Sequence, residues 1–159
     1  MNPTPPPYSF DTSALIDGLE RYYPAETFPA LWENVEALVE SGRFLMSEEV
    51  WEEACHCDAA VRDWATPRRS AIVVPTDADI AAHVASIGQR YPTWTADGRN
   101  QADPFVIATA LARGAIVVTG EKSNAGSDAR PKIPYACRAV GVQSMNFLDF
   151  VRNEGWVFG

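Results

Sequence analysis

The sequence predicts an α/β fold built on a mostly parallel sheet of about five strands. Short apolar runs alternate with amphipathic stretches from residue 8 onwards, which is the pattern of βαβ units. The amphipathic stretches repeat their apolar residues at three- and four-residue spacing, as helices do. The chain has 159 residues, the size of one domain with one core. We therefore expect a single domain over residues 8–159.

The apolar runs expected to form strands are residues 8–10, 44–46, 71–74, 116–119 and 142–145. Residues 28–41 have helical spacing and stop at Gly42. A second helix begins with Ser47 as its N-cap, a third covers residues 77–91, and a fourth covers residues 103–113, with Pro104 at its first position. Residues 92–102 and 122–134 are rich in turn formers, which indicates mobile loops. Residues 1–7 contain four prolines and should form an extended tail.

The charge balance narrows the classes of partner. Thirteen basic and 21 acidic side chains give a formal net charge of -8, which works against coating nucleic acid through its phosphates. A metal-dependent nuclease is less affected, because bound metal would cancel part of that charge. No apolar run approaches the roughly 20 residues that span a bilayer, and residues 1–7 do not have the pattern of a signal peptide. We expect a cytoplasmic protein with no membrane partner.

The three cysteines favour core thiols over a disulfide framework or a zinc site. Cys55, His56 and Cys57 are consecutive, but alternate residues of a helix point away from each other, and no second pair follows at a zinc-finger spacing.

Acidic side chains occur where apolar runs end or begin, and this is the most informative pattern in the chain. Asp11 follows the run ending at Phe10, Glu49 and Glu53 follow the second run, Asp103 begins an apolar helix, and Glu121 follows the fourth run. The carboxyl ends of parallel strands line one crevice, so these carboxylates should converge there. Several carboxylates in one crevice repel each other unless a cation neutralises them. The sequence therefore predicts a divalent-metal site.

The ordered motifs of the chain resemble the PIN-domain nucleases. They are the segment from Asp11 to Asp17, the segment from Asp103 to Ala110, and the segment from Gly114 to Glu121. The closer resemblance is to a PIN-like bacterial family labelled DUF4411, through Tyr22-Tyr23-Pro24, Glu49-Val50-x-x-Glu53, Thr119-Gly120-Glu121-Lys122, Lys132-Ile133-Pro134 and Cys137. It extends from about Tyr8 to Phe158.

The resemblance implies a three-layer α/β/α PIN-like fold with carboxylates that bind Mg²⁺ or Mn²⁺. It also implies an endoribonuclease in which a metal-activated water hydrolyses the phosphodiester bonds of RNA. Asp11, Asp103 and Glu121 match three of the family's acids. The fourth is Glu53, which follows Val50 at the family's spacing, and Glu49 is its substitute one helical turn earlier. Many PIN nucleases have aspartate at the position of Glu121. Many small PIN proteins are toxins of toxin–antitoxin pairs, so an antitoxin partner and a homodimer are further expectations.

Other side chains have supporting roles in this hypothesis. Hydroxyl groups of Thr12, Ser13 and Thr119 would orient the carboxylates or waters. Lys122 and Arg99 are candidate phosphate contacts, and Trp94, in a polar loop, is a candidate RNA contact.

Structural alternatives stand beside each of these interpretations. Asp11 and Asp103 could serve as N-caps, Glu49 and Glu53 could lie on a solvated helix face, and Glu121 could pair with Lys122 in a surface turn. The apolar residues near Phe147, Phe150 and Val151 suit either a dimer surface or a packed terminal helix. The rival function is a PIN-fold module that has lost catalysis and binds a protein or a nucleic acid.

Overall fold

The computed structural model describes residues 2–159 and contains a five-stranded sheet in the order β3-β2-β1-β4-β5. Every pair of neighbouring strands is parallel. The strands are β1 (Tyr8–Phe10), β2 (Phe44–Ser47), β3 (Val73–Val74), β4 (Ile116–Val118) and β5 (Ser144–Met145). The predicted α/β class and the five-stranded parallel sheet are thereby confirmed.

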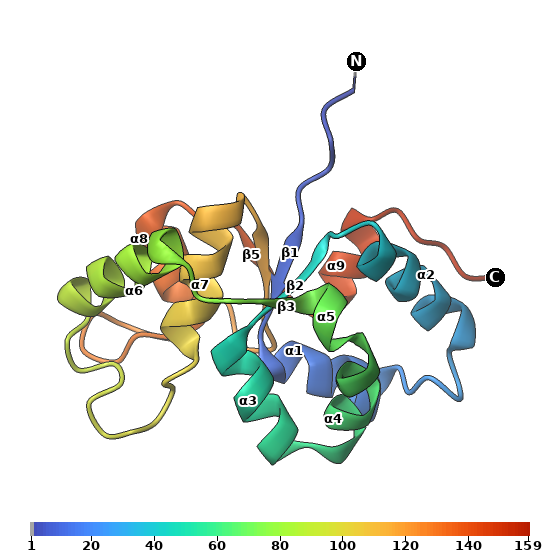
Figure 1. Cartoon of the computed structure of the whole chain (residues 1–159), viewed down its shortest axis with the longest axis horizontal. Coiled ribbons are helices and arrows are strands. Elements are labelled where there is room, and N and C mark those ends of the chain that lie inside the picture. Colours follow the sequence, from blue (N-terminus) through green and yellow to red (C-terminus); the bar gives the residue numbers. More distant parts are fainter. Residues whose placement is uncertain (1) are drawn as a thin grey trace.

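Helices cover both faces of the sheet, which gives the predicted three layers (Figure 1). The α-helices are α1 (Thr12–Ile16), α2 (Pro29–Glu40), α3 (Glu48–Cys57), α4 (Ala59–Ala65), α5 (Arg69–Ile72), α6 (Ala78–Arg90), α7 (Asp103–Arg113), α8 (Ile133–Val140) and α9 (Phe147–Asn153). A π-helical segment, η1 (Asp17–Tyr22), continues α1, and a 3₁₀ turn, η2 (Thr66–Arg68), precedes α5. In Figure 1, α6, α7 and α8 lie on one side of the strands, and α2, α5 and α9 lie on the other.

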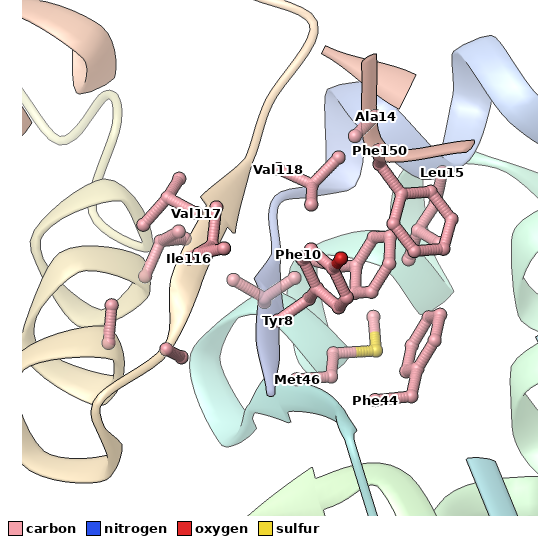
Figure 2. Packing of buried hydrophobic residues seen from close by; sticks show 14 of the residues in the cluster. Tyr8, Phe10, Ala14, Leu15, Phe44, Met46, Ile116, Val117, Val118 and Phe150 are labelled. Atoms are coloured by element: carbon pink, nitrogen blue, oxygen red, sulfur yellow. The ribbon is translucent and has the colours of Figure 1, made fainter. Parts of the chain in front are cut away.

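The alternation of side chains along β1 explains how this strand packs between the two layers. Tyr8 and Phe10 point to the face covered by α9, where Phe10 stacks on Phe44 with ring centroids 4.0 Å apart and meets Phe150 edge-on at 5.2 Å (Figure 2). Ser9 points the other way, and its hydroxyl donates a hydrogen bond to the carbonyl of Val106 in α7. The strand is therefore buried on both faces, as a central parallel strand should be.

The connectivity reverses at β1. The chain places β2 and β3 on one side of β1 and then places β4 and β5 on its other side. A crevice opens beyond the carboxyl ends of the two strands at such a switch point, and ligands of open α/β sheets bind there. Here the switch point lies between the ends of β1 and β4.

Several element boundaries differ from those predicted. The third strand has two residues, because Arg69–Ile72 form helix α5, and β4 and β5 are also shorter than expected. The helix after Ser47 is two helices, since Asp58 is extended and its side chain accepts a hydrogen bond from the Val61 amide, which starts α4. Residues 2–7 form no helix or strand, and Met1 of the predicted tail lies outside the described residues.

The terminal helix α9 is packed rather than exposed. Phe147, Phe150 and Val151 are all buried, and Phe147 lies against Gly18 of η1. Of the two alternatives for these residues, the packed terminal helix is the one that the structure shows, because the core already covers their side chains. Within residues 2–159, none of the helices combines the length and the apolar character needed to cross a membrane.

Candidate functional site

Four of the predicted acidic residues lie together at the switch point. Asp11 follows β1, Glu121 comes three residues after the end of β4, Asp103 is the first residue of α7, and Glu53 lies on α3. Helix α7 contacts β1, β4 and α3, so it brings these elements to one place. We call Asp11, Glu53, Asp103 and Glu121 the carboxylate cluster.

Asp11 is held at the bottom of this crevice, with an exposed fraction of 4 %. Its Oδ2 accepts hydrogen bonds from the hydroxyls of Ser13, at 2.5 Å, and Thr119, at 3.0 Å. Burial raises the pKa of the Asp11 carboxyl, and these two bonds act in the opposite direction. The side chain makes no N-cap bond to α1, so the capping alternative does not describe Asp11.

The same two hydroxyls tie Asp11 to the loop after β4. Ser13 Oγ accepts a hydrogen bond from the Gly120 amide at 2.8 Å, and Thr119 Oγ1 accepts one from the Glu121 amide at 3.2 Å. Each hydroxyl thus uses its proton for Asp11 and a lone pair for the backbone of the neighbouring strand end. This arrangement fixes the relative position of the chain segments that carry Asp11 and Glu121.

Asp103 is the most informative member of the cluster. It is 6 % exposed, and its Oδ2 has no hydrogen-bond partner among the described residues. Burial, followed by the negative charges of the other three cluster members, raises the pKa of Asp103 to about 8. Ala102, not Asp103, is the residue before α7, and no side chain caps this helix. The capping alternative therefore does not describe Asp103 either, and Pro104 is the second residue of the helix rather than the first.

Glu121 and Glu53 complete the cluster in different ways. One oxygen of Glu121 accepts a hydrogen bond from the Ile133 amide at 2.7 Å, at the start of α8. Burial raises the pKa of Glu121, and this bond opposes the rise. Glu53 is half-buried, and burial and the charge of Asp11 raise its pKa, whereas the nearby Thr12 hydroxyl lowers it. No group of the described residues, Glu53 included, lies in hydrogen-bond geometry with Thr12 Oγ1.

Glu49 does not join the cluster. Its carboxylate faces Thr76, whose hydroxyl lies 3.4 Å from both oxygens. Burial raises the pKa of Glu49, and the like charges that add to the rise are those of Glu48 and Glu52, not those of the cluster. Of the two candidates on this helix, the structure thus brings Glu53 and not Glu49 to Asp11.

The donor set of the cluster suits Mg²⁺ or Mn²⁺, which prefer carboxylate and water oxygens. Asp103 Oδ2 and Thr12 Oγ1 are buried without partners, as expected where a cation or its water would bind. In residues 2–159, no three acidic, histidine or cysteine side chains stand close enough to ligate one ion directly. A cation held by these residues would keep much of its hydration shell, which is the usual behaviour of Mg²⁺.

The predicted substrate contacts have different outcomes. Lys122 is exposed beside Glu121, on the wall of a pocket that also includes Thr119 and Gly120. Arg99 is exposed, and its Nε lies 3.8 Å from Asp97 Oδ2. Among the described residues it forms no ion pair with the carboxylate cluster. Trp94 is 5 % exposed and packs edge-on against Tyr91, so the prediction of an RNA contact at this side chain is wrong. The ring anchors its loop to the core.

Lys132 belongs to the site and was not among the predicted site residues. It precedes α8, it is half-buried, and its positive charge lowers the pKa of both Asp103 and Glu121. The motif Lys132-Ile133-Pro134 marked this segment in the sequence, but only the fold shows that the loop returns to the carboxylates.

Comparison with known proteins agrees with the extent of the domain. A family model described as a domain of unknown function, DUF4411, matches residues 8–158, which is nearly the whole chain. The comparison with curated proteins gave no match.

Proposed function

The chain belongs to the DUF4411 family, and we propose that it is a divalent-metal-dependent endoribonuclease. The observation that carries the proposal is the buried carboxylate of Asp103, whose Oδ2 has no hydrogen-bond partner in the described part of the chain and which is close to three further carboxylates at the switch point of the sheet. An arrangement of this kind costs stability unless a cation is bound. The choice of RNA as the substrate rests on the resemblance of the motifs around Asp11, Asp103 and Glu121 to those of PIN nucleases.

Asp11, Glu53, Asp103 and Glu121 would hold the Mg²⁺ or Mn²⁺. When bound, such an ion lowers the pKa of water and offsets negative charge on a phosphodiester. The hydroxyls of Ser13 and Thr119 keep the Asp11 carboxylate in one orientation.

The protein's own groups prepare the site in two further ways. Asp103, with a pKa of about 8, is mostly protonated at pH 7, and a cation held beside it would favour the ionised carboxylate. Lys132 supplies positive charge beside Asp103 and Glu121, and Lys122 stands exposed at the rim, where it would meet a phosphate. These local charges matter because a net charge of -8 repels RNA from most of the surface.

The finer biological assignment follows from the same resemblance. We propose that the protein acts in the cytoplasm as the toxin of a toxin–antitoxin pair, with an antitoxin protein as its partner. Induced expression of the wild-type chain should then arrest bacterial growth, and expression of the Asp11→Asn variant should not. Growth that is unaffected by an active, expressed nuclease would remove the toxin role and leave the enzymatic one.

One observation favours a second candidate, a binding module without catalysis. One oxygen of Glu121 is already used by the Ile133 amide, so its role in holding α8 could be structural. The absence of three converging ligands in residues 2–159 points the same way. In that case the protein would bind its partner with no need of metal.

The decisive experiment is cleavage of a mixed single-stranded RNA pool with Mn²⁺, by the wild type and by Asp11→Asn and Asp103→Asn. Glu49→Gln is the matched control, since it removes an acidic charge near the crevice but outside the cluster. Metal-dependent cleavage that survives only in the wild type and in Glu49→Gln supports the nuclease. No cleavage together with no calorimetric Mn²⁺ binding, by wild-type protein with a folded circular dichroism spectrum, would leave the binding module.

A further inference from the structure

A pocket of about 770 Å³ adjoins the carboxylate cluster at the ends of β4 and β5. Thr119, Gly120 and Glu121 form one of its walls, and Glu121 is also a member of the cluster. Its size falls within the range of about 300–1,000 Å³ that is usual for small-ligand sites. The pocket and the carboxylate cluster therefore share Glu121 and the chain segment that follows β4.

Another part of the wall is aromatic, and it comes from the end of η1 and from α9. It consists of Tyr22, Tyr23 and Phe147. Tyr23 stacks on the buried Phe147 with ring centroids 5.7 Å apart, and Tyr22 stands next to Tyr23 at 6.2 Å. Tyr22 is 60 % exposed, an unusual position for a large aromatic ring, and it lies at the pocket. Its ring is thus available to stack on a ligand.

The packing of η1 holds this aromatic wall in place. At Gly18, a Cβ atom would come within 2.7 Å of the Phe147 ring, so the glycine permits η1 to lie directly on α9. Tyr22 is the last residue of η1, four positions later. The backbone of Tyr22 therefore belongs to a helical segment that packs on α9 rather than to a loop.

The polar lining of the pocket combines neutral side chains with acidic ones and a lysine. Ser123, Asn124 and Asn146 line it with hydroxyl and amide side chains, which can pair with the edges of a nucleobase. Asp17 and Asp149 are also present, and their carboxylates pair with Arg21 at 3.2 Å and with Arg152 at 3.4 Å. Lys122 lies on the lining and makes no ion pair among the described residues, so it is available for a phosphate.

We propose that this pocket, which we call the Tyr22 pocket, binds a base of single-stranded RNA next to the bond that the carboxylate cluster cleaves. The inference rests on the proposed nuclease function. Single strands are recognised by stacking of unpaired bases on aromatic rings, together with hydrogen bonds to the base edges. An exposed ring, neutral amides, one free lysine and a wall shared with the cluster are what such a ligand requires.

The test measures binding separately from cleavage. Labelled RNA hexamers of A, U, C or G are titrated with full-length protein in EDTA, and fluorescence anisotropy gives the dissociation constant. Tyr22→Ala should weaken binding of the preferred hexamer by about tenfold or more, because loss of one stacked base has an effect of that size. Tyr22→Phe keeps the ring and should stay within about twofold. Phe158→Ala removes an exposed aromatic ring outside the pocket and should also leave binding unchanged.

The outcomes separate this inference from the nuclease itself. If Tyr22→Ala binds as the wild type does and cleaves RNA at the same positions, the Tyr22 pocket is not a base site even though the nuclease stands. Failure of the wild type to bind any hexamer would overturn the inference as well. If binding depends on Tyr22 but no metal supports cleavage, the base pocket is supported and the enzymatic proposal fails.

Discussion

Replacing Asp103 with asparagine removes an ionisable group from the carboxylate cluster while keeping the shape of the side chain. In the metal-free protein this carboxyl is 6 % exposed, lacks a partner for Oδ2 and faces three like charges. We expect the variant to be more stable than the wild type at neutral pH and, at the same time, to lose metal binding. A residue that serves only the fold would not behave in this way.

The magnitude follows from the pKa of Asp103, which is raised from 3.8 to about 8, chiefly by burial. Between about pH 4 and pH 8 the folded protein keeps a proton that the unfolded chain has released, so the free energy of unfolding falls as pH rises. One pKa unit corresponds to about 1.4 kcal/mol, which sets an upper limit of about 4 kcal/mol at pH 7. Water entry and side-chain rotation relieve part of this, and we expect about 2 kcal/mol.

Urea unfolding in EDTA at pH 5, 6, 7 and 8 measures the effect. The wild type should lose stability with rising pH, and Asp103→Asn should lose much less. At pH 7 a difference of about 2 kcal/mol corresponds to a melting temperature higher by roughly 4–8 °C for a chain of this size. Added Mn²⁺ should stabilise the wild type and have little effect on the variant.

Asp77→Asn is the control with the opposite sign. Asp77 caps α6 and pairs with Arg113, and its hydrogen bond from the Ile80 amide and this pair lower its pKa. Its contribution to stability is therefore present above its ordinary pKa and lost in acid, so Asp77→Asn should destabilise the protein at pH 7. The reasoning about Asp103 is refuted if Asp103→Asn is the less stable protein at pH 7, or if its difference from the wild type is constant from pH 5 to pH 8.

Three further predictions follow from other contacts. Glu53→Gln should weaken Mn²⁺ binding by tenfold or more in calorimetry, whereas Glu49→Gln should stay within about twofold; equal effects would reject the assignment of Glu53. Ser13→Ala should lower RNA cleavage by about tenfold with little change in unfolding, because the hydroxyl orients a cluster carboxylate; unchanged kinetics would argue against that role. Arg43→Ala should destabilise the protein by about 3 kcal/mol in urea, with no effect on metal affinity, since it leaves Glu154 without its two bonds of 2.7 and 2.8 Å.

The sequence was sufficient for the central elements because their local and tertiary preferences agree. Residues 8–10 carry two aromatic rings and are extended and buried on both faces. The predicted helix at 103–113 has Pro104 in its first turn and Gly114 in the left-handed conformation at its end. The two-residue strands β3 and β5 were harder to delimit. Their length depends on how far their neighbours continue the ladder, and a single sequence contains no information on that pairing.

The acidic members of the site were predictable for a related reason. Positions just beyond strand ends converge in any parallel sheet, so Asp11 and Glu121 could be paired before the structure was known. No such rule predicts that the loop carrying Lys132 returns to the carboxylate cluster. Trp94 could not be placed correctly from the sequence. Its polar neighbours indicated an exposed loop, whereas the ring itself is buried in the core.

The strongest argument that the carboxylate cluster is functional comes from comparing its charge balance with that of an ion pair elsewhere in the protein. The partly buried Glu154, for example, has Arg43 as its cationic partner at 2.7 Å. At the switch point, the positive charge that lowers the pKa of Asp103 and Glu121 comes from Lys132, whereas the cluster contains four carboxylates. The aromatic packing around Phe10 stabilises the fold and offsets the destabilising effect of this charge imbalance. If the cluster bound no ligand, any substitution that removed one of its carboxylates would stabilise the protein. The cluster therefore supports the proposal that a cation binds there.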